Sequence, residues 1–270
     1  MKKLLSIILL VILTADFFSG CKKDNGVPPA LPPKESMTID FSNFASGKKS
    51  ADLISDQKGT ENSSWEFAAT VAGVWKLIIN ITLAVPVTSF NLAADQDPVF
   101  INNNTWQWSY NASVANVTYK ARFTGQITAT EILWKMYITK EGTAGFAEFV
   151  WFEGTSKPDG SGGQWILNQS AQTPVPILQI DWTKSGTSIG NIKYTYIKNS
   201  DPFKTSFIEN GLTTGTLNAY FTIHYFTGLK FSDVNVEWNT TTLNGRVNSL
   251  DYLLGGWYCW NENKINIICP

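Results

Sequence analysis

The chain has 270 residues, with 21 basic and 22 acidic side chains and a formal net charge of −1. This balance, without an extended run of lysine and arginine after residue 36, argues against a nucleic-acid partner. Charged residues make up only 16% of the chain, while serine, threonine and asparagine are abundant. This composition is typical of a β-sheet protein whose outer face is neutral and polar.

The N-terminus has the pattern of an export signal. Two lysines precede the apolar run Leu4–Leu13, which is the plan of a secretory signal peptide. At about 15 Å of helix, the run is too short to span a bilayer. The tripeptide FSG then leads directly into Cys21, and FSGC resembles a bacterial lipobox, whose cysteine is lipidated. We predict a lipoprotein signal peptide at residues 1–20 and lipidation of Cys21, with an ordinary cleaved signal as the alternative.

Residues 21–36 contain four prolines and almost no apolar periodicity. We expect them to form a flexible, extended tether that packs no core. Acyl chains on Cys21 would hold the protein on a membrane, since each buried CH₂ contributes about 0.8 kcal/mol. By the lipobox resemblance, Lys22 after the cysteine favours the outer membrane of a Gram-negative cell envelope. The remaining residues, 37–270, are predicted to form a single domain.

The domain begins with MTIDFSNF, residues 37–44, in which Met37, Ile39 and Phe41 alternate with polar residues. This period of two predicts a half-buried strand. A polar stretch up to Ser63 is expected to be a loop.

A helix is predicted at about residues 63–85. Ser63 and Glu66 have the spacing of a capping box, and the residues from Trp65 onward are apolar nearly all round. Such a helix is buried on most sides, so we expect it to lie inside or across a curved sheet, with a kink at Pro86. A transmembrane helix is disfavoured by Lys76, Asn80 and Pro86. The many β-branched residues leave a strand at residues 76–83 as an alternative.

From Thr105 onward, apolar and polar residues alternate with a period of two, and turn sequences such as KEGTAG and SKPDGSGG separate the runs. No helical pattern intervenes. We therefore predict a mainly β fold, an antiparallel meander of about ten to twelve strands that curls into a barrel or half-barrel.

Two cysteines, Cys259 and Cys269, lie in the C-terminal sequence WYCWNENKINIIC. In an oxidising envelope such a pair most simply forms a disulfide, worth about 3 kcal/mol for a loop of ~11 residues. A redox or metal pair is the alternative. A two-residue turn at Glu262-Asn263 would not bring the cysteines opposite each other, so the bridge requires an odd-length loop centred near Lys264, or a bulge.

The segments FSGC, WFEGTSKPDGSGGQWILN and WYCWNENKINIIC resemble those of uncharacterised envelope lipoproteins of Bacteroidetes-type bacteria. The resemblance implies an envelope location and no known activity. At fold level, one helix packed in a long antiparallel sheet is similar to the half-barrel lipoprotein carriers that cradle lipid tails, which is an analogy of fold alone.

The sequence offers no assembled catalytic constellation. The single histidine, His224, is out of phase with its apolar neighbours and is expected on the polar face. The DGSGG stretch is expected to be a hairpin tip, since a phosphate-binding loop would be followed by Lys-Ser/Thr. Acidic residues on predicted strands are Glu131, Glu148, Glu153, Asp181 and Glu237, and nothing brings any two together. We predict no enzyme activity, no metal and no cofactor.

The 11 tryptophans are the most informative group. Aromatic residues are the natural filler of a β core, but they can also line a pocket or stack on a sugar. In the sequence EFVWF, both faces of the strand are apolar, which suggests that one face meets a second layer and the other a ligand. The predicted ligand-binding residues are Phe149, Trp151, Trp134 and Trp165.

Three functions follow as hypotheses. The first is a non-enzymatic lipoprotein, anchored to the membrane through Cys21, that holds an apolar or amphiphilic small ligand between helix and sheet. The second is a surface glycan-binding module with exposed tryptophans. The third is a structural or adhesion protein whose aromatic residues are fully packed.

Overall fold

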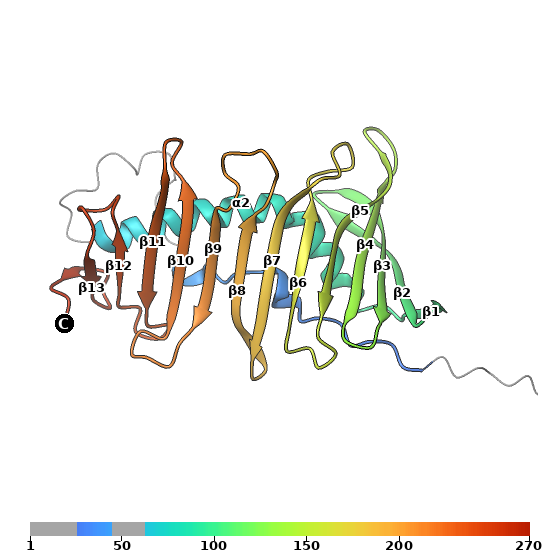
Figure 1. Cartoon of the computed structure of the whole chain (residues 1–270), viewed down its shortest axis with the longest axis horizontal. Coiled ribbons are helices and arrows are strands. Elements are labelled where there is room, and N and C mark those ends of the chain that lie inside the picture. The colour runs from blue at the N-terminus through green and yellow to red at the C-terminus, as the bar shows by residue number, and fades with distance from the viewer. Residues whose placement is uncertain (1–25, 45–62) are drawn as a thin grey trace, which may run out of the picture.

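The computed structural model describes residues 26–44 and 63–270 (Figure 1). The predicted signal peptide, Cys21 and the first part of the tether lie outside the described residues. Fourteen strands form one antiparallel sheet, in which every strand pairs with its neighbours in sequence order. The strands are β1 (Val99–Asn102), β2 (Thr105–Val114), β3 (Val117–Ile127), β4 (Ile132–Lys140), β5 (Phe146–Ser156), β6 (Gly162–Asn168), β7 (Pro176–Ser185), β8 (Ser188–Tyr196), β9 (Phe207–Leu212), β10 (Ala219–Phe226), β11 (Phe231–Trp238), β12 (Gly245–Ser249), β13 (Trp257–Trp260) and β14 (Asn266–Ile267).

The predicted antiparallel meander is confirmed. Of the two predicted shapes, a barrel or a half-barrel, the closed barrel is wrong because the sheet is not closed. Closure would require β1 to pair with β14, and these strands are instead the two edges. The number of strands also exceeds the predicted ten to twelve. The additional strands include short ones at the ends, such as β1 with four residues and β14 with two, and runs of this length are too short to show a clear period.

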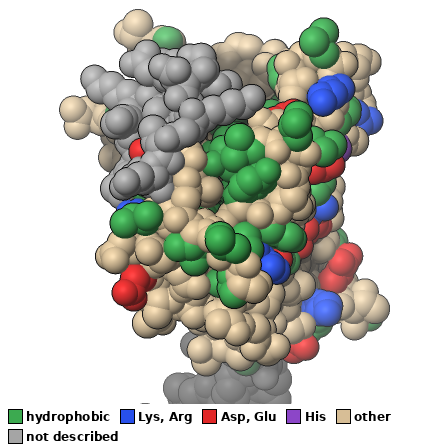
Figure 2. Space-filling view, turned by 90° about the vertical axis from the view of Figure 1, so that its left-hand side faces the viewer, with side chains coloured by type: hydrophobic (Ala, Val, Ile, Leu, Met, Phe, Trp, Pro, Cys, Tyr) green, Lys and Arg blue, Asp and Glu red, His purple; other side chains and the backbone are tan. Residues whose placement is uncertain are grey.

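The C-terminal end of the sheet, seen end-on in Figure 2, carries hydrophobic side chains on its surface. Leu254 and Ile268 are 91% and 95% exposed. The opposite end, at β1, also carries exposed apolar residues, so the elongated molecule has an apolar surface near each sheet edge.

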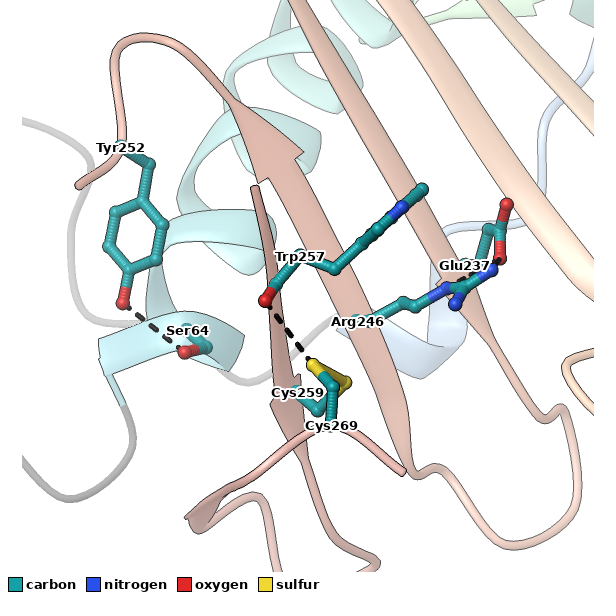
Figure 3. Close-up of a disulfide and its surroundings, with 7 residues drawn as sticks. All are labelled: Ser64, Glu237, Arg246, Tyr252, Trp257, Cys259 and Cys269. Atoms are coloured by element: carbon teal, nitrogen blue, oxygen red, sulfur yellow. Dashed lines mark hydrogen bonds and ion pairs between the residues drawn. A yellow bond between two sulfur atoms is a disulfide. The ribbon is translucent and has the colours of Figure 1, made fainter. Parts of the chain in front are cut away.

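The predicted cysteine pair is present in this C-terminal end (Figure 3). Cys259 and Cys269 are joined at an S–S distance of 2.14 Å, with their Cα atoms 5.1 Å apart. Cys259 pairs in register with Ile267, and Trp260 pairs with Asn266. The intervening loop therefore has an odd number of residues, as predicted, but it is centred one residue before Lys264. The second cysteine lies just beyond β14, so the bridge runs diagonally.

The helix α2 (Ser63–Ala93) lies against one face of the sheet, which we call the inner face; the opposite face is the outer face (Figure 1). The helix is longer than the predicted 63–85 because it continues through Pro86, and the alternative of a strand at residues 76–83 is wrong. By length and hydropathy α2 could cross a membrane. It nevertheless contacts β2 and β3 near one sheet edge and β12, β13 and β14 near the other.

Hydrogen bonds join each end of α2 to the sheet. The backbone N–H of Ser64 donates to Asn266 Oδ1 (3.1 Å), and the hydroxyl groups of Ser64 and Tyr252 are 3.2 Å apart (Figure 3). At the other end, the hydroxyl of Tyr110 donates to the carbonyl oxygen of Ser89 at 2.5 Å. Burial raises the pKa of Tyr110, because the charged phenolate is poorly solvated there. The phenol therefore stays a neutral donor to the helix.

Residues 26–44, which we call the strap, run across the inner face between α2 and the central strands (Figure 1). The strap contains two short 3₁₀ helices, η2 (Lys34–Met37) and η3 (Ser42–Phe44). The first of these contacts β7 and β8 as well as α2. Its Ser36 is buried and its hydroxyl accepts a hydrogen bond from Trp165 Nε1 at 3.2 Å.

The strap differs from two predictions. Its first part, residues 26–36, was expected to be a spacer that packs no core, yet Pro29 and Pro32 are buried. Proline has no backbone N–H, so it can cover the sheet without burying an unpaired donor. Residues 37–44 keep the predicted alternation of buried and exposed side chains, but the predicted strand is wrong because this segment pairs with no strand of the sheet.

Tryptophans and glycines face each other across the strands of the core. Four buried or nearly buried tryptophans each lie opposite a glycine of the neighbouring strand, and a Cβ atom added to that glycine would be 2.4–2.8 Å from the ring. The glycines therefore make room for indole rings on a crowded inner face. The pairs are Gly125–Trp134, Gly154–Trp165, Gly163–Trp182 and Gly245–Trp260.

Candidate functional site: an aromatic cluster on the inner face

Strand β5 is irregular where the sequence is most aromatic. Phe152 pairs with Met136, but the next residue of β4, Tyr137, pairs with Val150. Trp151 is therefore an extra residue in a β-bulge. A second register shift follows between Phe149 and Phe146. Bulges bend a strand and change the direction of its side chains. A strict period of two would place Phe146 on one face of β5 and Phe149 and Trp151 on the other. With the two register shifts, all three side chains reach the inner face.

The result is a cluster of four aromatic side chains, Tyr119 from β3 and Phe146, Phe149 and Trp151 from β5, which we call the aromatic cluster. The ring centroids of Phe149 and Trp151 are 5.3 Å apart, and those of Phe146 and Phe149 are 5.4 Å apart. Tyr119 lies 6.3 Å from Trp151. These are normal separations for interacting aromatic rings. All four side chains are only partly buried, so their other surfaces remain free to contact a ligand.

The four predicted ligand-binding residues fall into two groups. Phe149 and Trp151 lie in the aromatic cluster. Trp134 and Trp165 are fully buried in the core, and the Nε1 of Trp134 donates to Ser156 Oγ at 2.9 Å. The ring of Trp165 packs 5.3 Å from that of Phe90 on α2. These two tryptophans have no accessible surface to offer a ligand.

Two members of the cluster, Tyr119 and Phe146, are not among the ligand-binding residues that the sequence predicted. Tyr119 could have been found, because it alternates with the inward-facing Ala121 and Phe123. Phe146 lies on the face of the buried Phe152, as a period of two gives, but the same period puts Phe149 and Trp151 on the opposite face. A period-two pattern does not locate a bulge, so the sequence does not show that these rings meet.

The space between helix and sheet, where the sequence predicted a ligand, is filled along the middle of the sheet by the strap. Phe41 lies 5.5 Å from Phe221, and Phe44 lies 4.9 Å from Trp238, between ring centroids. Met37 is completely buried there. This chain's own side chains thus occupy the central part of the predicted ligand position, and the aromatic cluster stays partly open.

The outer face beside the aromatic cluster is charged. Arg122 Nη2 lies 2.7 Å from Glu148 Oε1, and its guanidinium carbon lies 3.7 Å from the centre of the Tyr137 ring. The hydrogen bond from Arg122 lowers the pKa of Glu148, because it stabilises the carboxylate form. The ion pair keeps the Glu148 carboxylate ionised and ordered on the outer surface.

Three of the other acidic candidates also have side-chain partners on the outer face. Glu153 pairs with Lys135 (3.1 Å), and Glu237 pairs with Arg246 (2.7 Å). Asp181 accepts hydrogen bonds from two glutamine side chains at 2.7 Å each. Within residues 26–44 and 63–270, no group of three or more His, Cys, Asp and Glu side chains could hold a metal ion.

His224 lies on the partly exposed outer face, as predicted. Its Nδ1 is 2.7 Å from Asp233 Oδ1. Its ring stacks on Phe231 at 4.6 Å with an interplanar angle of 4°, and Phe207 stacks on the other side at 5.5 Å. The stacking partners and the carboxylate together hold the imidazole in a fixed orientation as part of the sheet surface.

A hollow of about 610 Å³ on the outer face lies near the C-terminal sheet edge and is lined by Tyr220, Glu237, Arg246 and the loop 213–217, among others. The Arg246–Glu237 ion pair lies in this lining (Figure 3). The guanidinium carbon of Arg246 is also 4.2 Å from the centre of the Trp257 ring. The cation is therefore already neutralised and covered by this chain's own groups.

Searches against protein-family models, curated proteins and solved structures find no match for this chain. The resemblance to envelope lipoproteins therefore rests on the segments FSGC, WFEGTSKPDGSGGQWILN and WYCWNENKINIIC alone.

Proposed function

We propose that the protein is a non-enzymatic envelope lipoprotein, anchored through Cys21, that binds the apolar part of an amphiphilic small ligand at the aromatic cluster. The observation that carries this proposal is the irregular register of β5. Two register shifts bring Phe146, Phe149 and Trp151 together with Tyr119, and the rings stay partly accessible. Covering apolar surface of this kind is favourable by about 25 cal/mol per Å².

The two alternative functions have less support. A glycan-binding module would present exposed tryptophans, whereas seven of the 11 are buried. The buried ones are Trp65, Trp108, Trp134, Trp165, Trp182, Trp238 and Trp260. A purely structural protein would pack its aromatic residues fully, and the four rings of the aromatic cluster depart from that pattern.

The proposed ligand site can be tested with 11-(dansylamino)undecanoic acid, a fluorescent fatty acid, titrated into the full mature protein. We expect Trp151→Ala to weaken probe binding at least tenfold. The matched control is Trp257→Ala, which removes another partly buried tryptophan far along the sheet. Equal affinities for the wild type and both variants, with urea unfolding showing that all three fold, would refute the aromatic cluster as the ligand site.

The proposed anchor has a separate test. Cys21→Ala removes the residue that would carry the acyl chains, so we expect the variant to leave the membrane fraction and appear in the soluble fraction. Mass spectrometry of the wild-type N-terminal peptide should show the added lipid mass. Membrane association that persists in Cys21→Ala would rule out the lipid anchor.

A further inference from the structure

The first strand of the sheet is an apolar edge. β1 consists of Val99, Phe100, Ile101 and Asn102 and contains no charged residue. Val99 is 63% exposed and Ile101 is 43% exposed. Edge strands of soluble proteins are protected by charges, prolines, bulges or short length. β1 has only four residues and a register shift between Phe100 and Asn102, which hinder pairing with another strand. These features leave its apolar side chains uncovered, so the edge fits an apolar contact that needs no strand pairing.

The inner side of the same edge is aromatic. Phe100 pairs in register with Trp106 of β2, and their ring centroids are 5.5 Å apart with an interplanar angle of 75°. Both side chains are partly buried. Tryptophan and phenylalanine beside exposed valine and isoleucine are the side chains found where proteins meet the boundary between lipid and water.

The strap enters the fold at this end of the molecule. Gly125, Trp106 and Phe100 pair in register across β3, β2 and β1. Pro29 of the strap is buried and lies next to Gly125 at this position of the sheet. Figure 1 shows the strap passing below β1 where it leaves the sheet. Val27, two residues earlier, is 80% exposed. The chain therefore leaves the folded domain beside the apolar edge.

The distance from this point to the proposed anchor is short. Five residues lie between Cys21 and Val27, and the six extended residue steps that join them reach at most about 20–22 Å. The sequence alone predicted a longer spacer up to residue 36, but the strap packs from Pro29 onward. A lipid on Cys21 would therefore hold the β1 end of the domain close to the bilayer.

We propose that the β1 edge, formed by Val99, Phe100, Ile101 and Trp106, rests in the interfacial region of the lipid bilayer to which Cys21 is anchored. This inference rests on the proposed lipid anchor. The exposed apolar residues at the other end do not fit this role, because 14 strands spaced by ~4.8 Å place the far edge up to about 60 Å away along the sheet. The contact is apolar rather than electrostatic, since the nearby Asp95 and Asp97 would repel anionic headgroups.

The experiment uses the mature lipidated protein in vesicles of phosphatidylethanolamine and phosphatidylglycerol (3:1) that contain 5-doxyl-phosphatidylcholine as a quencher. A single cysteine is introduced by Ile101→Cys and labelled with the NBD fluorophore. Two matched variants are labelled in the same way: Ile81→Cys, on the outward side of α2, and Leu254→Cys, at the opposite end. Circular dichroism checks that each variant folds.

We expect the label at residue 101 to be quenched at least twofold by the lipid-borne quencher, with a blue-shifted emission, and the label at residue 254 to be unaffected. Quenching at residue 81 in place of residue 101 would overturn the proposed orientation, because α2 would then face the membrane. A blue shift at residue 101 that appears without vesicles and grows with protein concentration would also overturn it, since the edge would then pair with a second copy.

The experiment distinguishes a failure of the proposed lipid anchor from a failure of the proposed edge contact. Without lipidation, the protein would not float with the vesicles at all, and the proposed function would lose its anchor. With lipidation, vesicle flotation succeeds, and unquenched labels at residue 101 would then refute the edge contact alone.

Discussion

At the scale of single residues, the core depends on glycines that leave room for indole rings. A Cβ atom on Gly125 would lie 2.4 Å from Trp134 and 3.1 Å from Pro29 of the strap. The missing side chain at residue 125 thus lets a tryptophan and a proline share one position on the inner face. In contrast, Gly73 of α2 has nothing within 4 Å of its added Cβ.

Replacing these two glycines by alanine should change the free energy of unfolding in opposite directions. Gly125→Ala should lower the free energy of unfolding by about 1–3 kcal/mol, because it overpacks a filled core. Gly73→Ala should raise it by about 0.5–1 kcal/mol, because alanine favours the helix and nothing obstructs its methyl group. Urea unfolding of both variants measures the difference, and a stabilising Gly125→Ala would mean that Trp134 and Pro29 can move aside.

At the scale of elements, the sequence of α2 is apolar nearly all round because the helix carries apolar residues both on its packed side and on its exposed side. Leu83 and Phe90 are buried against the sheet and strap, whereas Leu77 and Ile81 are 55% and 72% exposed on the side away from it. The helix therefore has a packed apolar side and an unpacked one. The sequence predicts the helix but does not show which of its apolar residues the sheet covers.

Two leucine-sized side chains on this helix provide a matched pair. Leu83→Ala should destabilise the protein by about 2–5 kcal/mol, since it leaves a cavity in the core. Ile81→Ala should change stability by less than about 0.5 kcal/mol, because its side chain is already in solvent. Thermal and urea unfolding test both changes; a large loss for Ile81→Ala would show that another surface covers this side of the helix in solution.

At the scale of the whole molecule, the sheet is a linear array. Each strand pairs only with its sequence neighbours, from β1 to β14, and the helix and strap are the elements that join distant strands. Arrays of this kind can open locally at one end without unfolding elsewhere. The disulfide lies at the C-terminal end, next to the strands that hold the start of α2.

Reduction of the Cys259–Cys269 disulfide should therefore act locally. We expect faster amide hydrogen exchange in β13, β14 and the first turns of α2 after reduction, with no change in β4–β8. The entropy of the released loop sets the scale at about 3 kcal/mol. Hydrogen exchange followed by mass spectrometry, with and without reductant, measures this. Uniformly faster exchange across the sheet would mean that the molecule unfolds as a single cooperative unit.

The sequence by itself determined the antiparallel meander, the existence of the helix and the cysteine pair, because period-two alternation, an apolar helical run and two envelope cysteines are local signals. Only the tertiary structure decided that the sheet stays open, that the strap fills the inner face, and that Phe149 and Trp151 separate from Trp134 and Trp165. Those outcomes depend on register and on contacts between residues far apart in the chain. A one-residue bulge at Trp151 changes which face its neighbours occupy, and local sequence periodicity carries no record of that shift.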